Sequence, residues 1–384
     1  MPRPLVTLAT GLVAGGASTL VAGLAGPSAA APPTPAGPTY VALGDSYASA
    51  AGVEPVDPTA PPECQRSLRN YAHVVAERTG AALTDVTCGG ADTSHFRTSQ
   101  HPGVAPQLDA LSAGTELVTV TIGGNDGGVF GSAIRDCSIA GFSTGGAGSP
   151  CRDEHGSSYE DTVRQATYPA LVQALTDVRE RAPRARVGVL GYPWILPAEG
   201  SCFGRMPVAE GDVPYLRSLQ ATLNDAVRRA AEATGATYVD LAGVSEGHDA
   251  CQPAGTRWIE PVFGGTNPVV VHPNAFGEEQ MAAAAIRTLG LPEVPQPSAG
   301  DRVLRRYDGL VAHQRIPAAQ ARALRRPVRA VVRYAALGLD TDAALRLQLL
   351  RDRVTGERRA GDLTRPQARA LKRFSRRAAE WLDL

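Results

Sequence analysis

The chain has 384 residues, of which 43% are hydrophobic and 20% charged, a globular composition that excludes wholesale disorder. Its formal net charge of zero hides two regions of opposite sign. Residues 1–300 contain 18 Lys and Arg against 29 Asp and Glu, whereas residues 301–384 contain 20 against 9. The length predicts more than one domain, and the charge separates an acidic body from a basic C-terminal region.

The N-terminus has the features of an export signal. Arg3 supplies a positive charge, residues 5–25 are apolar, and Ser28-Ala29-Ala30 offers small residues at a cleavage site. We predict a signal peptide over residues 1–30 and a secreted, extracellular protein. The alternative is an uncleaved anchor helix over the same residues. No other stretch of the sequence approaches the ~18 apolar residues that a membrane span needs.

The cysteine content agrees with an oxidising compartment. None of the six cysteines belongs to a C-x-x-C pair, which disfavours zinc ribbons and thioredoxin-like redox sites. Disulfides are therefore expected, and free thiols are disfavoured outside the cell, although the spacing leaves the connectivity open. The six are Cys64, Cys88, Cys137, Cys151, Cys202 and Cys251.

A Pro-rich spacer, residues 31–38, precedes short apolar runs that alternate with helical patterns. Strands are predicted at Thr39–Leu43, Ala82–Val86, Leu117–Ile122, Arg186–Gly191 and Thr237–Leu241, and helices at Tyr159–Arg181, Tyr215–Thr234 and Asn274–Thr288. This alternation predicts an α/β domain over residues 39–291, in which helices cover both faces of a five-stranded parallel sheet.

A second Pro-rich linker, residues 292–300, leads into the Arg-rich region 301–384. This region is predicted to be helical, and Thr364 with Gln367 forms a capping-box pattern. A near-repeat at 320–326 and 367–373 is either a duplicated helix or a product of composition. The region is interpreted as a solvated helical appendage; the alternative is that its arginines contact anionic lipid or the cell envelope at the periphery. A secreted chain with few aromatic residues in this region is not expected to bind nucleic acid.

Four candidate functional residues follow predicted strands. Ser46 comes after the first strand, Gly90 in a turn after the second, Asn125 after the third, and His272 opens the last helix. The carboxyl ends of parallel strands meet at one edge, where a nucleophile, N–H donors and a base would converge. Each residue alone could be a helix cap or a turn former, but the joint placement favours a hydrolytic site.

These motifs resemble the SGNH (GDSL-type) lipases and esterases, in particular their secreted actinobacterial branch. The matched blocks are Gly44-Asp45-Ser46, Cys88-Gly89-Gly90-Ala91, Gly123-Gly124-Asn125-Asp126 and His272-Pro273-Asn274, within about residues 39–290. The resemblance implies a flavodoxin-like three-layer α/β/α fold, Ser46 as nucleophile and His272 as general acid/base. It also implies an oxyanion hole of the Ser46 and Gly90 N–H groups and the Asn125 side chain, and consecutive pairing of the six cysteines.

The sequence departs from the family pattern at one position. The family usually has an Asp three residues before the His, and here that residue is Val269. We expect a main-chain carbonyl at Val269 to orient the His272 ring, since a carbonyl can fix the imidazole tautomer without supplying charge. Asp240 and Glu260 are the alternative supports.

Other patterns indicate no further chemistry. Gly141-Phe142-Ser143-Thr144-Gly145 matches the G-x-S-x-G elbow of α/β-hydrolases but lies in a Gly/Ser-rich stretch, so we predict a loop. Asp45 and Asp126 are interpreted as turn and network residues. The histidines have no metal-ligand spacing and no dinucleotide fingerprint is present, so neither a metal nor a cofactor is expected.

We therefore predict a secreted serine ester hydrolase, a lipase or esterase and potentially a phospholipase, acting on a lipid or small acyl ester through an acyl-enzyme on Ser46. We expect a monomer. One alternative is a carbohydrate O-acetylesterase on the same scaffold, and another is a catalytically inactive envelope-binding protein. Fold alone does not decide the substrate.

Overall fold

The computed structural model describes residues 37–295, 298–382 and 384. The predicted signal peptide and most of the 31–38 spacer lie outside these ranges. Within the described ranges, every helix is too short or too polar to span a bilayer.

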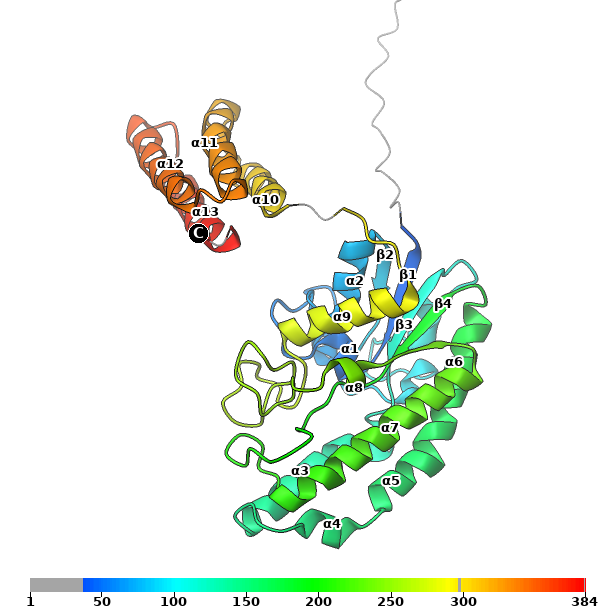
Figure 1. The fold of residues 1–384 in the computed structure, drawn as a ribbon. Coiled ribbons are helices and arrows are strands. Elements are labelled where there is room, and N and C mark those ends of the chain that lie inside the picture. The colour runs from blue at the N-terminus through cyan, green and yellow to red at the C-terminus, as the bar shows by residue number, and fades with distance from the viewer. Residues whose placement is uncertain (1–36, 296–297, 383) are drawn as a thin grey trace, which may run out of the picture. The chain divides into compact units, whose positions relative to one another are not determined.

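Five parallel strands form one sheet, which confirms the predicted fold class (Figure 1). They are β1 (Thr39–Gly44), β2 (Ala82–Asp85), β3 (Leu117–Thr121), β4 (Arg186–Leu190) and β5 (Thr237–Val239). The spatial order is β2-β1-β3-β4-β5. The chain runs from β1 outward to β2 and then back across to β3, so the strand order switches direction around β1. In open α/β sheets, ligands bind beyond the carboxyl ends of the strands at such a point.

Helices cover both faces of the sheet, as predicted. On one face, α2 (Tyr71–Thr79) packs against α9 (Ala275–Leu289), and on the other α6 (Tyr168–Arg181) packs against α7 (Val213–Ala233) (Figure 1). The alternation of side chains along β1 serves both layers: Tyr40 and Ala42 join the core under α2 and α9, while Val41 and Leu43 join the core under α6 and α7.

Shorter elements complete the domain. The helices are α1 (Ser46–Ser49), α3 (Val129–Ser143), α4 (Pro150–His155), α5 (Ser158–Thr162) and α8 (Leu241–Val244). One π-helical turn spans Val163–Thr167, and 3-10 turns span Pro62–Cys64, Thr93–Phe96, Gln107–Ala110, Asp126–Gly128 and Glu210–Asp212. The helix predicted at Tyr159–Arg181 is thus α5, the π turn and α6 in succession.

The prediction of a loop at residues 141–145 was wrong. Gly141, Phe142 and Ser143 form the last turn of α3, and Thr144 is the C-cap of the helix. A nucleophile elbow needs a strand before its serine and a helix after it, so this segment has the opposite arrangement.

The described cysteines are all paired, and the pairing is consecutive, as the resemblance implies. The disulfides are Cys64–Cys88, Cys137–Cys151 and Cys202–Cys251.

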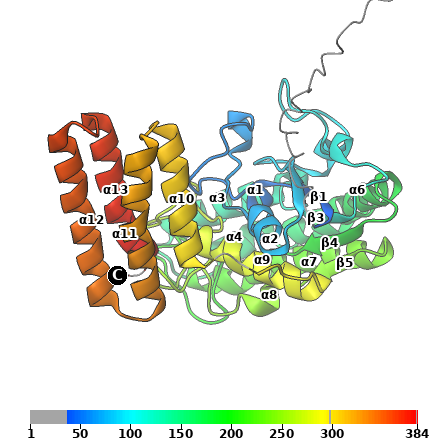
Figure 2. The ribbon, with the colours of Figure 1, turned by 90° about the horizontal axis from the view of Figure 1, so that it is seen from above.

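The C-terminal region consists of α10 (Ala299–His313), α11 (Ala318–Ala336), α12 (Asp340–Ala360) and α13 (Arg365–Trp381), which pack on one another (Figure 2). Thr364 and Gln367 form the predicted capping box of α13. The 292–300 linker prediction ends too late, because Ser298 and Asp301 form a second capping box that starts α10 at Ala299. Both copies of the near-repeat lie in helices, α11 and α13.

Candidate active site

Ser46 lies at the carboxyl end of β1, as the first residue of α1. Gly44 has a φ of +139°, and a side chain there would collide with the Thr121 carbonyl, so the turn requires glycine. Gln107, only 2% exposed, holds the Gly44 backbone from both sides, because its Oε1 accepts the N–H (2.7 Å) and its Nε2 donates to the carbonyl (3.0 Å). Asp45 caps α1 by accepting the Tyr47 N–H (2.9 Å). Ser46 is the one residue of 41–50 that is not buried.

The structure brings Ser46 and His272 together across 226 residues of sequence. His272 Nε2 lies 2.7 Å from Ser46 Oγ, and Nδ1 lies 2.7 Å from the Val270 carbonyl oxygen. Because a carbonyl can only accept, Nδ1 must carry the proton. The lone pair of Nε2 is then free to take the serine proton, which is the arrangement of a general base beside its nucleophile.

The carbonyl that orients His272 belongs to Val270, so the prediction of Val269 was wrong. Val271 is buried with a φ of +61°, and this left-handed residue folds the chain back so that the carbonyl two residues before the histidine faces its ring. The Val269 N–H is bound instead to Asn267 Oδ1 (2.9 Å).

Neither proposed carboxylate supports the histidine. Asp240 caps α8, where it accepts the Gly243 N–H (3.0 Å). The Glu260 carboxylate is bound by Arg257 (2.8 Å) and Asn274 (2.9 Å). The Glu260 backbone, however, pairs with the histidine loop, since its N–H donates to the His272 carbonyl (2.9 Å). Glu260 thus acts on the site as scaffold, a role that no sequence pattern indicates.

Tyr47 is a positioning residue that sequence reasoning missed. Its hydroxyl donates to the Val271 carbonyl (2.7 Å), and its ring centroid lies 5.1 Å from that of His272. The tyrosine therefore links the nucleophile helix to the strained histidine loop. Its place directly after Ser46 is the only signal that the sequence offers.

The predicted oxyanion donors follow three adjacent strands. Gly90 is exposed with a φ of +76°, and Asn125 Nδ2 donates to the Ala91 carbonyl (2.8 Å), which ties the loop after β3 to the loop after β2. An amide nitrogen carries two hydrogens, so Asn125 keeps one for a ligand. Among the described residues, the Ser46 and Gly90 N–H groups donate to no protein acceptor, so they too are available to a ligand.

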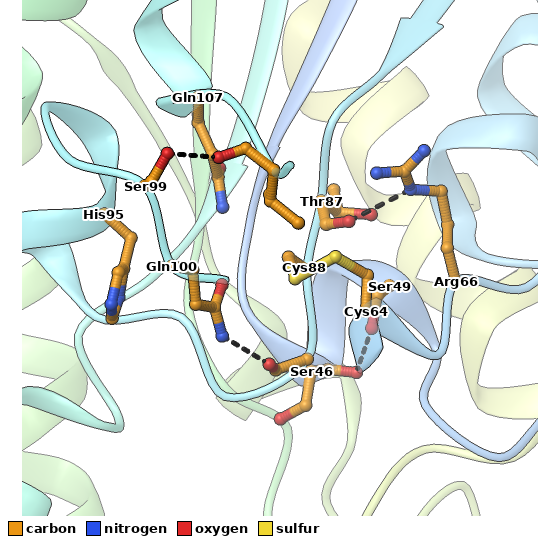
Figure 3. Close-up of a disulfide and its surroundings, with 12 residues drawn as sticks. Ser46, Ser49, Cys64, Arg66, Thr87, Cys88, His95, Ser99, Gln100 and Gln107 are labelled. Atoms are coloured by element: carbon orange, nitrogen blue, oxygen red, sulfur yellow. Dashed lines mark hydrogen bonds between the residues drawn. A yellow bond between two sulfur atoms is a disulfide. The ribbon is translucent and has the colours of Figure 1, made fainter. Parts of the chain in front are cut away.

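A disulfide supports the turn that presents Gly90 (Figure 3). The Gly89 N–H donates to the Cys64 carbonyl (2.9 Å), and Cys64 is covalently joined to Cys88. On the other side, Gln100 Nε2 donates to the Gly89 carbonyl (2.7 Å). The turn beside Ser46 is therefore fixed from both sides.

A buried network links the serine turn to the loop after β3. Tyr192 donates its hydroxyl to Asp45 (2.5 Å) and accepts the Gly124 N–H (2.9 Å). Burial raises the pKa of Asp45 to about 7, against the opposing hydrogen bonds of Tyr192 and Tyr47. Asp126 accepts the Thr93 N–H (3.2 Å) and hydroxyl, and burial raises its pKa to about 6. Both aspartates are network residues, in agreement with the sequence interpretation.

The electrostatics of the site favour a neutral histidine. His272 is 9% exposed, and burial lowers its pKa below the ordinary value of 6.5, although the hydrogen bond to Val270 opposes this. The imidazole is then ready to accept a proton at neutral pH.

An apolar slot opens beside the loop after β3. Its walls are Gly123, Gly124 and Tyr192 together with side chains of α3, the π turn and α7, among them Phe130, Ala133, Ile134, Leu216 and Leu219. The slot is narrow, with a volume of about 50 Å³. Phe130 also lies against His272, at 6.1 Å between ring centroids. Through Phe130 the slot adjoins the catalytic histidine, and it extends from there along α3 and α7.

Within the described residues, no group of three or more His, Cys, Asp or Glu side chains is arranged to hold a metal ion. The assembled site thus offers a serine with a base, free N–H donors and an apolar slot. These parts can carry out acyl transfer.

Comparison with known proteins agrees with this chemistry. The chain is 58% identical over 295 residues to lipase 2 of Streptomyces coelicolor, an alignment that covers 76% of this chain and 100% of that lipase. It is 32% identical over 245 residues to a lipase of Streptomyces rimosus, covering 63% of this chain and 82% of that one.

Two solved structures share the fold. A phospholipase A1 from Streptomyces albidoflavus NA297 is 29% identical with a TM-score of 0.55, and 66% of this chain and 98% of that one are covered. An extracellular lipase from Streptomyces rimosus is 27% identical with a TM-score of 0.54, and 65% and 99% are covered.

The model of the GDSL-like lipase/acylhydrolase family matches residues 42–280, a range that contains Ser46, Gly90, Asn125 and His272 and ends before α10. The chain therefore belongs to the GDSL-like lipase/acylhydrolase family and is a carboxylic ester hydrolase.

Proposed function

We propose that the chain hydrolyses acyl esters of lipids through an acyl-enzyme on Ser46, with His272 as general acid and base. The observation that carries the proposal is the hydrogen bond between Ser46 Oγ and His272 Nε2, with the opposite ring nitrogen held by the Val270 carbonyl. This geometry couples the nucleophile directly to a neutral base.

The reaction has two halves. Ser46 Oγ attacks the ester carbonyl carbon as its proton passes to His272 Nε2, and the tetrahedral oxyanion accepts hydrogen bonds from the Ser46 N–H, the Gly90 N–H and Asn125 Nδ2. The intermediate collapses as His272 returns the proton to the leaving alcohol. A water molecule then attacks the acyl-enzyme as its proton passes to His272. The bond between the acyl carbon and Ser46 Oγ breaks, His272 returns the proton to Ser46 Oγ, and the carboxylic acid is released.

The apolar slot supports a lipid substrate. Apolar pockets with a few polar groups at one end are typical of sites that bind apolar ligands. The narrow slot lined by α3 and α7 suits one unbranched acyl chain, whose carbonyl would lie at Ser46 and whose first carbons would pass Gly123 and Gly124. A sugar ring bearing an acetyl group would leave the slot empty.

The test is hydrolysis of p-nitrophenyl esters from acetyl to palmitoyl, with Ser46→Ala alongside. Rates that rise toward medium or long chains and vanish in the variant agree with the proposal. Activity on the acetyl ester alone would favour a deacetylase, and equal rates in the two proteins would exclude Ser46 as nucleophile.

The proposal includes secretion as a monomer after cleavage following Ala30. Three disulfides support an oxidising compartment, and one similar structure is that of an extracellular lipase. N-terminal sequencing of protein from the culture medium should begin at Ala31, and intact protein retained in cells would contradict this. We also place the hydrolase domain at residues 39–291 and a basic region at 301–384 that contacts anionic lipid or the cell envelope.

A further inference from the structure

The C-terminal helices form a packed unit with a core of their own. The core side chains come from all four helices and the turns between them, and include Val303, Tyr307, Leu324, Leu347 and Phe374. In sequence order, each helix contacts the next, and α10 also contacts α13 (Figure 2). The four helices therefore form a closed bundle in which each helix packs against two neighbours.

Charge is distributed unevenly around this bundle. Together α11 and α13 carry 11 basic residues and one acidic residue, Glu380. By contrast α12 carries five basic and four acidic residues. Solubility alone does not require an excess of basic over acidic residues on a helix, whereas a surface that binds anions does.

A groove lies along the seam between α10 and α13. Arg306, Arg373, Arg376, Arg377 and Trp381 are among the residues that line it, and its volume is about 680 Å³. Arg306 stacks over the Trp381 ring at 4.1 Å. Among the described residues, none of these four guanidinium groups lies within ion-pair distance of a carboxylate, although Glu380 also lines the groove.

We propose that the α10/α13 groove binds the phosphodiester head groups of an anionic phospholipid bilayer and holds the enzyme on a lipid surface. The guanidinium fork matches two phosphate oxygens at once, and arginines without a carboxylate partner need break no ion pair to bind. Tryptophan is favoured at the boundary between head groups and acyl chains. The choice of a bilayer over a soluble anion rests on the proposed function, since a lipase finds its substrate in lipid aggregates.

The test is co-sedimentation of the full chain with vesicles of ether-linked lipids, which an esterase cannot cleave. One set contains phosphatidylcholine alone and the other contains phosphatidylglycerol as well. The groove variant is Arg373→Gln, Arg376→Gln and Arg377→Gln together. The matched control is Arg346→Gln, Arg358→Gln and Arg359→Gln on α12, which removes the same charge from the same residue type.

The wild type and the control should bind phosphatidylglycerol vesicles, and the groove variant should bind roughly 10- to 100-fold more weakly, from the loss of three arginine–head-group contacts. Added salt should weaken wild-type binding. All three proteins should hydrolyse a soluble p-nitrophenyl ester at the same rate and have the same far-UV circular dichroism. Vesicle binding tests the groove and hydrolysis of the soluble ester tests the proposed function. A negative result in one assay therefore leaves the result of the other valid.

Three results would overturn the proposal. The first is no binding of the wild type to phosphatidylglycerol vesicles. The second is equal weakening in the groove and α12 variants, which would indicate a nonspecific effect of charge. The third is complete displacement from vesicles by inorganic phosphate at the same concentration as the lipid head groups, which would indicate a site for a soluble anion.

Discussion

The hydroxyl of Tyr47 joins the nucleophile helix to the histidine loop, so its removal should reduce catalysis. In Tyr47→Phe the buried Val271 carbonyl loses its donor, a cost of about 1–3 kcal/mol. If the loss of this hydrogen bond raises the activation barrier by the same free energy, because the histidine loop leaves its productive position, kcat should fall roughly 5- to 100-fold with little change in KM. Steady-state kinetics on a soluble p-nitrophenyl ester measures this.

Tyr40→Phe is the matched control. Tyr40 is equally buried, and its hydroxyl bonds to that of Thr119 (2.6 Å), but it lies near the start of β1, at the opposite end from Ser46. This variant should lose stability and keep its kcat. If the two variants lose kcat alike, Tyr47 has no positioning role beyond stability.

The dependence of activity on pH should reflect a histidine without a carboxylate. Burial lowers the pKa of His272, so the neutral base persists below pH 6.5, and kcat/KM should fall only as pH drops through that depressed pKa. A pH–rate profile on a soluble ester measures the acid limb. An apparent pKa above 6.5 would instead indicate that an acidic group stabilises the imidazolium, contrary to the hydrogen bond with Val270.

At this scale the sequence reveals residues whose chemistry is tied to a motif. Ser46 and Asn125 each follow a strand and His272 precedes a helix, all in recognisable blocks, and the structure brings Ser46 and His272 into contact. Whether the Val270 or the Val269 carbonyl faces the histidine depends on the φ of a single residue, Val271. Its positive φ is a conformation that favours glycine, so a valine at this position gives no sign of it in the sequence. Gln107 acts across 63 residues of sequence, so local patterns cannot indicate its role.

At the scale of elements, α3 and α7 should control acyl-chain length because they form the walls of the slot. Ala133 on α3 is 2% exposed and lines the slot. In Ala133→Leu the larger side chain should fill the slot. Loss of about 1–3 kcal/mol of apolar contact with the acyl chain should lower kcat/KM for palmitoyl esters by roughly tenfold or more. The acetyl ester should be hydrolysed as before.

The control for this variant is its melting temperature, because a larger side chain can also overpack a core. An equal loss on acetyl and palmitoyl esters at unchanged stability would mean that the acyl chain does not enter the slot. A loss confined to long chains cannot come from general unfolding.

The disulfides should differ in what they do for the enzyme. Cys64–Cys88 closes 24 residues, and Cys202–Cys251 closes 49, so removing either should cost about 3–4 kcal/mol of stability in the loop-entropy account. Only the first supports the turn that carries Gly90 (Figure 3). We therefore expect Cys64→Ala/Cys88→Ala to lose kcat below its unfolding temperature and Cys202→Ala/Cys251→Ala to keep it. Equal kcat in both double variants would show that the turn needs no covalent support.

The strands and long helices were predictable because burial imposes simple periods. The strand β3 is buried along its whole length and consists of leucine and the β-branched residues valine and threonine, and α7 follows a helical period. The π turn at Val163–Thr167 and the end of α3 at Ser143 were not predictable, since both depend on packing against other elements. Tertiary contacts decide where such elements break.

At the scale of the molecule, the charge and proline content of the sequence separate the acidic body from the basic C-terminal region. The cores agree with this division: two contain residues from Tyr40 to Leu291, and the third contains residues from Val303 to Leu384. No buried cluster in the described residues draws on both ranges. The groove between α10 and α13 could not be foreseen, because which helices adjoin is a property of the fold.

Because the cores share no residue, a chain that ends at Pro295 should keep its esterase activity. Residues up to 295 must be retained, since Glu293 pairs with Arg78 (2.7 Å) and the Val294 N–H donates to the Arg78 carbonyl (2.8 Å). The truncated chain should hydrolyse a soluble p-nitrophenyl ester within about twofold of the full chain, because no catalytic contact is removed. On vesicles of ester-linked phosphatidylglycerol it should be slower, because the basic helices are gone and the remaining net charge is negative. Loss of soluble-ester hydrolysis by a folded truncated chain would show that the C-terminal helices take part in the reaction itself, and equal rates on vesicles would show that they do not bring the enzyme to lipid.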